Sequence, residues 1–128
     1  MKRINIPSGS EYEELVGYSR AVRVGNVIEV AGTTSMRDGQ VRGLGEPYYQ
    51  VKIILKKIEQ AIIDAGGSMN DVIRTRIYVV DMAIWEDVAR AHGEVFGTIR
   101  PASTLVQVSS LVDPDMLVEI EATAILGG

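Results

Sequence analysis

Apolar and polar residues alternate along the chain with periods that change several times, and these changes define the expected elements. Two short β-favouring runs, at about 19–24 and 27–32, flank Gly25-Asn26. That dipeptide suits a tight hairpin, because both residues tolerate positive φ. The following residues, 33–46, are glycine-rich and polar, which predicts a long loop in which Asp38-Gly39 turns a minor ribbon.

From Pro47 the apolar residues recur at spacings of three and four, which predicts an amphipathic helix that ends at Gly66-Gly67. Its apolar face comprises Val51, Ile54, Leu55, Ile58, Ile62 and Ala65. An alternating strand is predicted over 72–80, after which Asp81 is placed to cap a second helix. The apolar stripe of the second helix comprises Ile84, Val88, Ala91 and Val95. By contrast, residues 1–17 are expected to be irregular.

The last third of the chain contains two further alternating runs, at 100–108 and 116–125. Asp113-Pro114-Asp115 predicts a turn between them, because proline cannot donate to a strand ladder and aspartate favours turns. A hairpin of neighbouring strands is expected, although this loop could also join strands that are not neighbours.

The predicted order β-β-α-β-α-β-β is typical of a single α+β domain over 1–128, with a mixed sheet and two helices on one face. The other sheet face would then be left uncovered although it is apolar. Its expected apolar residues are Val22, Val24, Val27, Tyr78, Val80, Leu105 and Ile125. An exposed apolar face of this size usually marks an association surface, so an oligomer is predicted.

Polar and charged residues are expected on the same uncovered face. They are Glu29, Arg74, Arg76, Tyr78, Ser103, Gln107, Glu119 and Glu121. Charges beside an apolar interface need partners, so one interpretation is a set of structural ion pairs between subunits. The other is a small anion-binding cleft in which an arginine binds the anion and a glutamate positions water.

Composition excludes several kinds of site. The chain has no cysteine, which excludes disulfides, thiolate metal sites and cysteine nucleophiles, and its single histidine, His92, excludes a histidine-rich metal site. His92 is expected to be a packed side chain. A net charge of −4 disfavours general binding to nucleic acid or to an anionic membrane. A soluble, cytoplasmic protein without metal or cofactor is expected, since no apolar run reaches the ~20 residues of a membrane span.

Three segments together resemble the RidA family (YjgF-type), whose founding members are reactive-intermediate enamine/imine deaminases. The segments are YSRAVRVGNVIEVAGT, DAGGSMNDVIRTRIYVVDM and RPASTLVQVSSLVDPDMLVEIEATA. The resemblance extends from Tyr18 to Ile125. It implies a chorismate-mutase-like α+β fold and a homotrimer whose sheets face inward, with small-molecule clefts between subunits.

The resemblance also implies a site. Tyr18 and Gly32 fall at substrate-binding positions, and Glu119 falls at the position that holds the catalytic water. The family's carboxylate-binding arginine falls at Ser103, and a cysteine of the same strand falls at Leu105. Serine cannot supply the cationic fork that a carboxylate prefers, so the usual deaminase site is altered here.

Arg76 and Arg100 are the two candidates to replace the missing cation, and alternation favours Arg76. Three functions follow: hydrolytic deamination of a small enamine or imine, non-catalytic binding of a metabolite by a trimer, or the endoribonuclease activity ascribed to some relatives. Few aromatic residues and the acidic charge disfavour the third. The expected partners are further copies of the chain and a small ligand such as a carboxylate.

Overall fold

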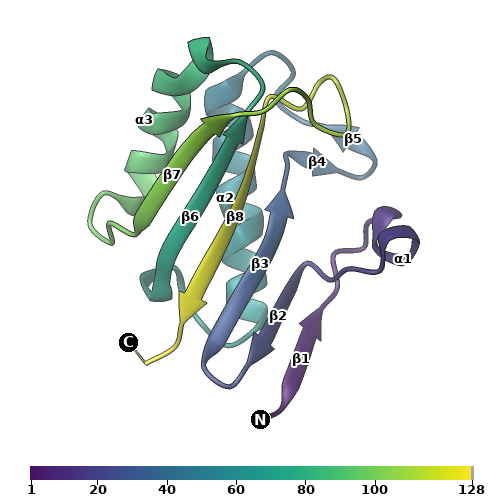
Figure 1. Cartoon of the computed structure of the whole chain (residues 1–128), viewed down its shortest axis with the longest axis vertical. Coiled ribbons are helices and arrows are strands. Elements are labelled where there is room, and N and C mark those ends of the chain that lie inside the picture. The colour runs from purple at the N-terminus through teal and green to yellow at the C-terminus, as the bar shows by residue number, and fades with distance from the viewer. Residues whose placement is uncertain (128) are drawn as a thin grey trace.

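A computed structural model describes residues 1–127, which form a six-stranded sheet with helices on one side (Figure 1). The strands are β1 (Arg3–Ile6), β2 (Ala21–Val24), β3 (Val27–Thr33), β4 (Met36–Arg37), β5 (Gln40–Val41), β6 (Val72–Val79), β7 (Ala102–Gln107) and β8 (Val118–Ile125). The helices are α1 (Tyr12–Val16), α2 (Pro47–Asp64) and α3 (Trp85–Phe96), with short 3-10 turns at Met69–Asp71 and Met82–Ile84. The sheet order is β1-β2-β3-β8-β6-β7, and β4 pairs only with β5.

The expectation that residues 1–17 are irregular was wrong. β1 pairs antiparallel with β2 and extends the sheet by one edge strand. α1 follows, and Gly17 ends it at φ 82°, a left-handed conformation that glycine adopts without strain. A four-residue strand shows little alternation of its own, and β1 is defined by its pairing with a strand about 18 residues away along the chain.

Both predicted tight turns are confirmed. β2 and β3 form an antiparallel hairpin around Gly25, which has φ 60°. β4 and β5 form the minor ribbon, and its turn residues Asp38 and Gly39 both have positive φ, as a two-residue hairpin turn requires.

The predicted hairpin between the last two strands was wrong. β8 lies between β3 and β6 and is antiparallel to both, whereas β7 is an edge strand that runs parallel to β6. The link between β7 and β8 therefore joins strands that are not neighbours, which was the alternative left open. The central place of β8 agrees with its apolar residues on the face beneath the helices. All four are fully buried: Val118, Ile120, Ala122 and Ala124.

The expected facing of β7 was also wrong. The parallel register sets Ser103 beside Thr75 and Leu105 beside Ile77, which are buried residues beneath the helices. Ser103, Leu105 and Gln107 therefore belong to the helix face. Alternation divides a strand into two sets but does not say which set faces the core, and in β7 the more apolar set, Ala102, Thr104 and Val106, faces away from the helices.

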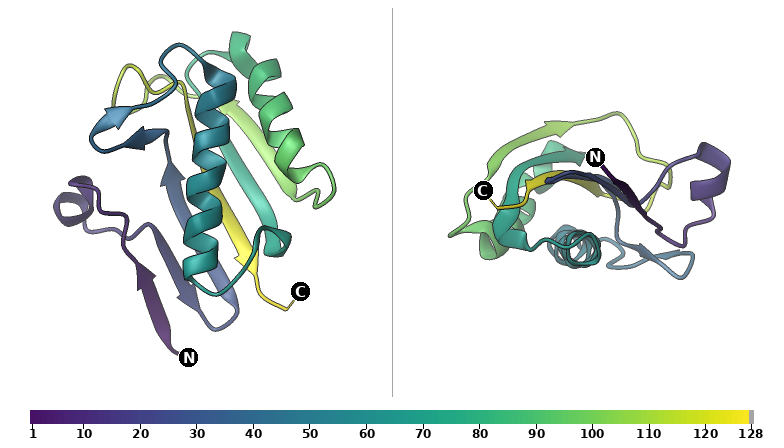
Figure 2. Two further views of the ribbon diagram at one scale, coloured as in Figure 1. Left: turned by 180° about the vertical axis from the view of Figure 1, so that it is seen from behind. Right: turned by 90° about the horizontal axis from the view of Figure 1, so that it is seen from below.

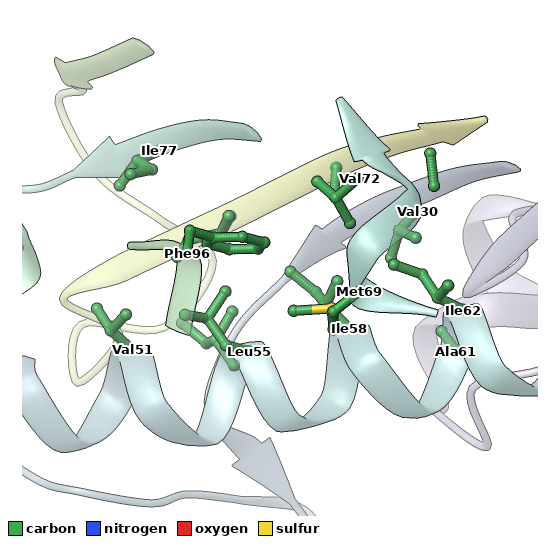
Figure 3. Close-up of a cluster of buried hydrophobic side chains, with 14 of the residues drawn as sticks. Val30, Val51, Leu55, Ile58, Ala61, Ile62, Met69, Val72, Ile77 and Phe96 are labelled. Carbon is green, nitrogen blue, oxygen red and sulfur yellow. The ribbon is translucent and has the colours of Figure 1, made fainter. Parts of the chain in front are cut away.

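Helices α2 and α3 both cover the same face of the sheet, as predicted (Figure 2). α2 has Pro47 in its first turn, and Gly66 and Gly67 end it by donating to carbonyls of its last turn. Asp81 caps the 3-10 turn that leads into α3, since its carboxylate accepts from the Ala83 amide. The apolar stripe of α2 packs against β3 and β8 to form the core (Figure 3).

Candidate functional site

A cleft of about 810 Å³ is lined by residues of α1, of β3 and of the β4–β5 ribbon. Figure 1 shows where these elements lie in the fold. Three of the predicted site residues, Tyr18, Gly32 and Glu119, line this cleft together. They come from the segment before β2, from β3 and from the central strand β8. The structure thus gathers the three positions at which the resemblance implied substrate and water contacts.

Glu119 supplies the carboxylate of the cleft. Burial raises the pKa of Glu119 above its ordinary value, and the negative charge of Glu121 adds to this effect, while Arg20 opposes it. A carboxylate with a raised pKa is a better proton acceptor near neutral pH and releases the proton again more slowly. Glu119 therefore has the properties of a group that exchanges a proton with water or with a ligand.

Gly32 makes room for the Glu119 carboxylate. It lies where β3 shifts its register against β8, between Val30 and Thr33. A methyl group at position 32 would touch the carboxylate of Glu119 and would lie 2.9 Å from its Cδ. Glycine at this position therefore permits the side chain of Glu119 to lie against the backbone of β3.

Replacing Gly32 with alanine is expected to displace the Glu119 carboxylate without unfolding the protein. The backbone at Gly32 has no positive φ, and the clashing atoms are at the free end of a flexible side chain. We expect ligand turnover or affinity to fall by about 10-fold or more, because misplacing a catalytic group by about 1 Å is costly, with a small change in melting temperature. Gly93→Ala is the control, since Gly93 lies in α3 outside the cleft, has no positive φ, and an added Cβ there would meet no atom within 4 Å. An active Gly32→Ala protein would contradict this role.

Sequence reasoning missed the basic residues of the cleft, among them Arg20 and Lys57. Arg20 donates through Nη1 to the Gly32 carbonyl at 3.3 Å and to Thr33 Oγ1 at 2.7 Å. Lys57 reaches from α2 and donates to the carbonyls of Thr34 and Met36, each at 2.7 Å. Arg20 follows Tyr18 by two residues, and this spacing is the only sequence signal that pointed to either of them.

Arg76, the predicted replacement cation, does not line the cleft. It lies on the uncovered sheet face, where its Nε is 3.8 Å from Glu121 Oε1. The same oxygen accepts a hydrogen bond from the Tyr78 hydroxyl at 2.6 Å, which raises the pKa of Tyr78. Nearby, Arg74 donates to Thr104 at 2.7 Å. The polar groups of this face thus find partners within one chain.

Ser103 and Leu105 are also outside the cleft. Ser103 accepts a hydrogen bond from Thr75 at 2.8 Å, and Thr75 in turn contacts His92 Nε2 at 2.9 Å. Burial lowers the pKa of His92, which is packed beside Phe96 as expected. Leu105 packs against the core cluster. Arg100, the other candidate cation, precedes β7 and donates to the Gly97 carbonyl.

The cleft therefore offers carboxylates, tyrosines and several cations, which suit a small polar ligand and a proton transfer. Within residues 1–127, no cluster of three histidine, aspartate or glutamate side chains is arranged to hold a metal ion. In the same part of the chain, no helix is long and apolar enough to cross a membrane.

Comparison with known proteins agrees with the sequence resemblance. The family model described as Endoribonuclease L-PSP matches residues 9–126. An uncharacterized protein of Streptomyces coelicolor is 38% identical over 122 residues, covering 95% of this chain and 91% of that protein. The 3-aminoacrylate deaminase RutC of Acinetobacter baylyi is 32% identical over 124 residues, covering 96% of this chain and 97% of that protein.

Solved structures give the same result. A crystal structure from Mycobacterium tuberculosis, described as a member of the highly conserved YjgF/YER057c/UK114 family, has a TM-score of 0.89 and 45% identity over 98% of this chain and 100% of that one. A putative endoribonuclease from Thermotoga maritima has a TM-score of 0.87 and 27% identity, with complete coverage of both chains. The chain therefore belongs to the L-PSP endoribonuclease family, the YjgF or RidA family that its sequence resembles, and has the α+β fold of that family.

Proposed function

We propose that this protein hydrolyses a small enamine or imine metabolite in the cleft and releases ammonia. The observation that carries the proposal is the half-buried Glu119 carboxylate with its raised pKa, lodged against Gly32 in a cleft of suitable size. Membership of the family supports it, as does the similarity to a 3-aminoacrylate deaminase along almost the whole chain.

The proposed reaction needs one water molecule and one group that moves protons. An enamine gains a proton on carbon and loses one from nitrogen, which gives an imine whose carbon is open to attack. Glu119 accepts a proton from water as the water oxygen bonds to that carbon, and then returns the proton to nitrogen. The hydroxyl proton of this adduct then moves to nitrogen as the C–N bond breaks, so that a carbonyl forms and ammonia leaves. Tyr18 lines the cleft with Glu119 and is the proposed second contact to the substrate.

The proposed assembly is a homotrimer in which a neighbouring copy completes each cleft. Exposed apolar side chains support association, both on the uncovered sheet face at Val24, Val27 and Val106 and at the cleft wall at Val16 and Val112. β7 is an edge strand with Ser103 exposed, so Ser103 and Leu105 stay predicted ligand contacts through a neighbouring copy. The mass in solution tests this assembly, and a monomer would contradict it.

The activity is tested by adding the purified protein to systems that generate 2-aminoacrylate or 3-aminoacrylate. We expect ammonia release above the spontaneous rate with at least one of these two enamines, because both carry the nitrogen-bearing carbon that the reaction needs. A rate equal to the spontaneous rate with both would contradict the deaminase proposal. Ligand binding without turnover would instead favour the metabolite-binding trimer.

A further inference from the structure

Three cations lie together on a wall shared by two adjoining clefts. Arg20 precedes β2, Arg37 is in β4 and Lys57 is in α2, so three distant parts of the sequence supply them. All three line the cleft that contains Glu119 and also a neighbouring cleft of about 550 Å³. We name Arg20, Arg37 and Lys57 the basic cluster. These three residues come together only in the folded protein, because each belongs to a different part of the chain.

The positive charges of the basic cluster are not neutralised by ion pairs with acidic side chains. Among residues 1–127, none of its three members forms a salt bridge. Of the acidic groups that line the same two clefts, Asp38, Glu59 and Asp64 have other partners. Asp38 pairs with Arg42 at 3.8 Å, Glu59 pairs with Lys56 at 3.8 Å, and Asp64 accepts from Gln60. Holding like charges together destabilises the fold, and a bound anion would offset that cost.

Two members of the cluster are already held in place by the backbone. Lys57 uses two of its three N–H donors on the carbonyls of Thr34 and Met36. Arg20 uses only Nη1, on Gly32 and Thr33, which leaves its other guanidinium donors for a ligand. Donors that are fixed before a ligand arrives lose little entropy on binding. The geometry is therefore that of a preformed anion site.

We propose that the basic cluster binds the carboxylate of the substrate within the same subunit that supplies Glu119. This inference rests on the proposed function and adds the residues that select an acidic substrate. The basic cluster thus takes the role of the carboxylate-binding cation, which the sequence analysis gave to Arg76. The guanidinium of Arg76 instead faces Glu121 outside the cleft.

The position of Arg20 limits the size of the substrate. Its charge acts on the pKa of both Glu119 and Lys57, so it lies close to each of them. It also bonds the backbone at Gly32, against which the Glu119 carboxylate lies. A ligand that reaches from Arg20 to Glu119 is consequently short, because both side chains contact the backbone of Gly32.

Pyruvate and pyruvamide provide the test, because they have the same shape and differ in charge. We expect Lys57→Gln and Arg20→Gln each to raise the Kd for pyruvate by about 10-fold or more, the usual effect of losing a charge-assisted hydrogen bond. The Kd for the neutral pyruvamide should change little. Arg76→Gln is the matched control and should leave pyruvate binding unchanged. Unaltered pyruvate affinity in both cluster variants, or a loss confined to Arg76→Gln, would overturn the proposal.

A charge-preserving variant separates binding from folding, because Lys57 also ties a loop to α2. Burial, then Arg20 and Arg37, lower the pKa of Lys57 to about 8. Pyruvate affinity of the unmodified protein should therefore decrease as the pH rises through 8, and Lys57→Arg should bind pyruvate without that decrease. The charged groups that line the two clefts with Lys57 are Glu11, Arg20, Arg37, Asp38, Lys56, Glu59, Asp64 and Glu119. An identical pH dependence in Lys57→Arg would contradict the role of Lys57.

Ammonia release measured on the same preparations distinguishes the two proposals. Absent ammonia release by the unmodified protein, together with weakened pyruvate binding in the cluster variants, would reject the deaminase activity and support the anion site. Normal turnover together with unchanged pyruvate binding in those variants would reject the anion site and support the deaminase activity.

Discussion

Replacing Glu119 with glutamine is expected to lower the rate of ammonia release by a factor of about 10² to 10⁴, the usual contribution of a positioned acid or base. Glutamine has almost the same size as glutamate, so the space beside Gly32 is kept while the ability to exchange a proton is lost. The rate is measured with the enamine that the unmodified protein hydrolyses. Glu29→Gln is the control, because Glu29 lies on the same sheet face and accepts from Thr123 but does not line the cleft.

The same Glu119→Gln protein is expected to melt at a higher temperature near neutral pH. The folded-state pKa of Glu119 is raised, so protonation of this group stabilises the fold at low pH, and that contribution is lost as pH rises through the folded pKa. Above it the fold carries a poorly solvated charge, which glutamine removes. A stabilised but inactive protein would show that this carboxylate is kept for function. An unchanged rate would contradict the assignment, as would an equal loss in Glu29→Gln.

Replacing Gln50 with leucine is expected to destabilise the fold by roughly 2 kcal/mol or more, since each buried polar group left unpaired costs about 1 to 3 kcal/mol. Gln50 is fully buried in α2. Its amide nitrogen donates to the carbonyls of Gly43 and Asp115 at 3.1 and 3.0 Å, and its oxygen accepts from the Leu117 amide at 3.0 Å. Leucine fills a similar volume but removes the Gln50 partner of the Asp115 carbonyl and of the Leu117 amide, whereas the Gly43 carbonyl still accepts from the Glu46 amide at 2.9 Å.

Urea denaturation measures the loss at Gln50, with Gln60→Leu as the matched control. Gln60 lies on an exposed part of the same helix and bonds only to Asp64, so we expect its replacement to change the free energy of unfolding by about 0.5 kcal/mol or less. Equal effects of the two substitutions would show that the Gln50 hydrogen bonds contribute little to stability.

Elements set by local pattern were predictable from the sequence. The spacing of apolar residues located α2, and Gly25 and Asp38-Gly39 located the two tight turns. The pairing of the last strands was not predictable, since the neighbours of β8 are strands from distant parts of the chain and alternation carries no information about partners. The wrong facing of Ser103 and Leu105 has the same origin, because the register with β6 sets it.

The sequence predicted only those residues of the candidate site that the resemblance to the family had pointed to. Tyr18, Gly32 and Glu119 do meet in one cleft. Lys57 was missed because a lysine that flanks the apolar stripe of a helix looks like any solvent-exposed lysine until the loop before β4 folds over it. Arg76 was expected in the site because it shares a sheet face with Glu119, but a shared face did not bring it to the same cleft.

The central position of β8 gives the two sides of the cleft different resistance to local unfolding. β8 is hydrogen-bonded on both edges and buried against α2, so Glu119 belongs to the part of the fold that opens last. The opposite wall includes α1, which has no buried residue, and the ribbon β4–β5, which pairs with no other strand. A ligand can therefore enter through local opening of that wall while the carboxylate keeps its place. The part of the domain that admits the ligand and the part that holds the proton-transferring carboxylate therefore differ in stability against local unfolding.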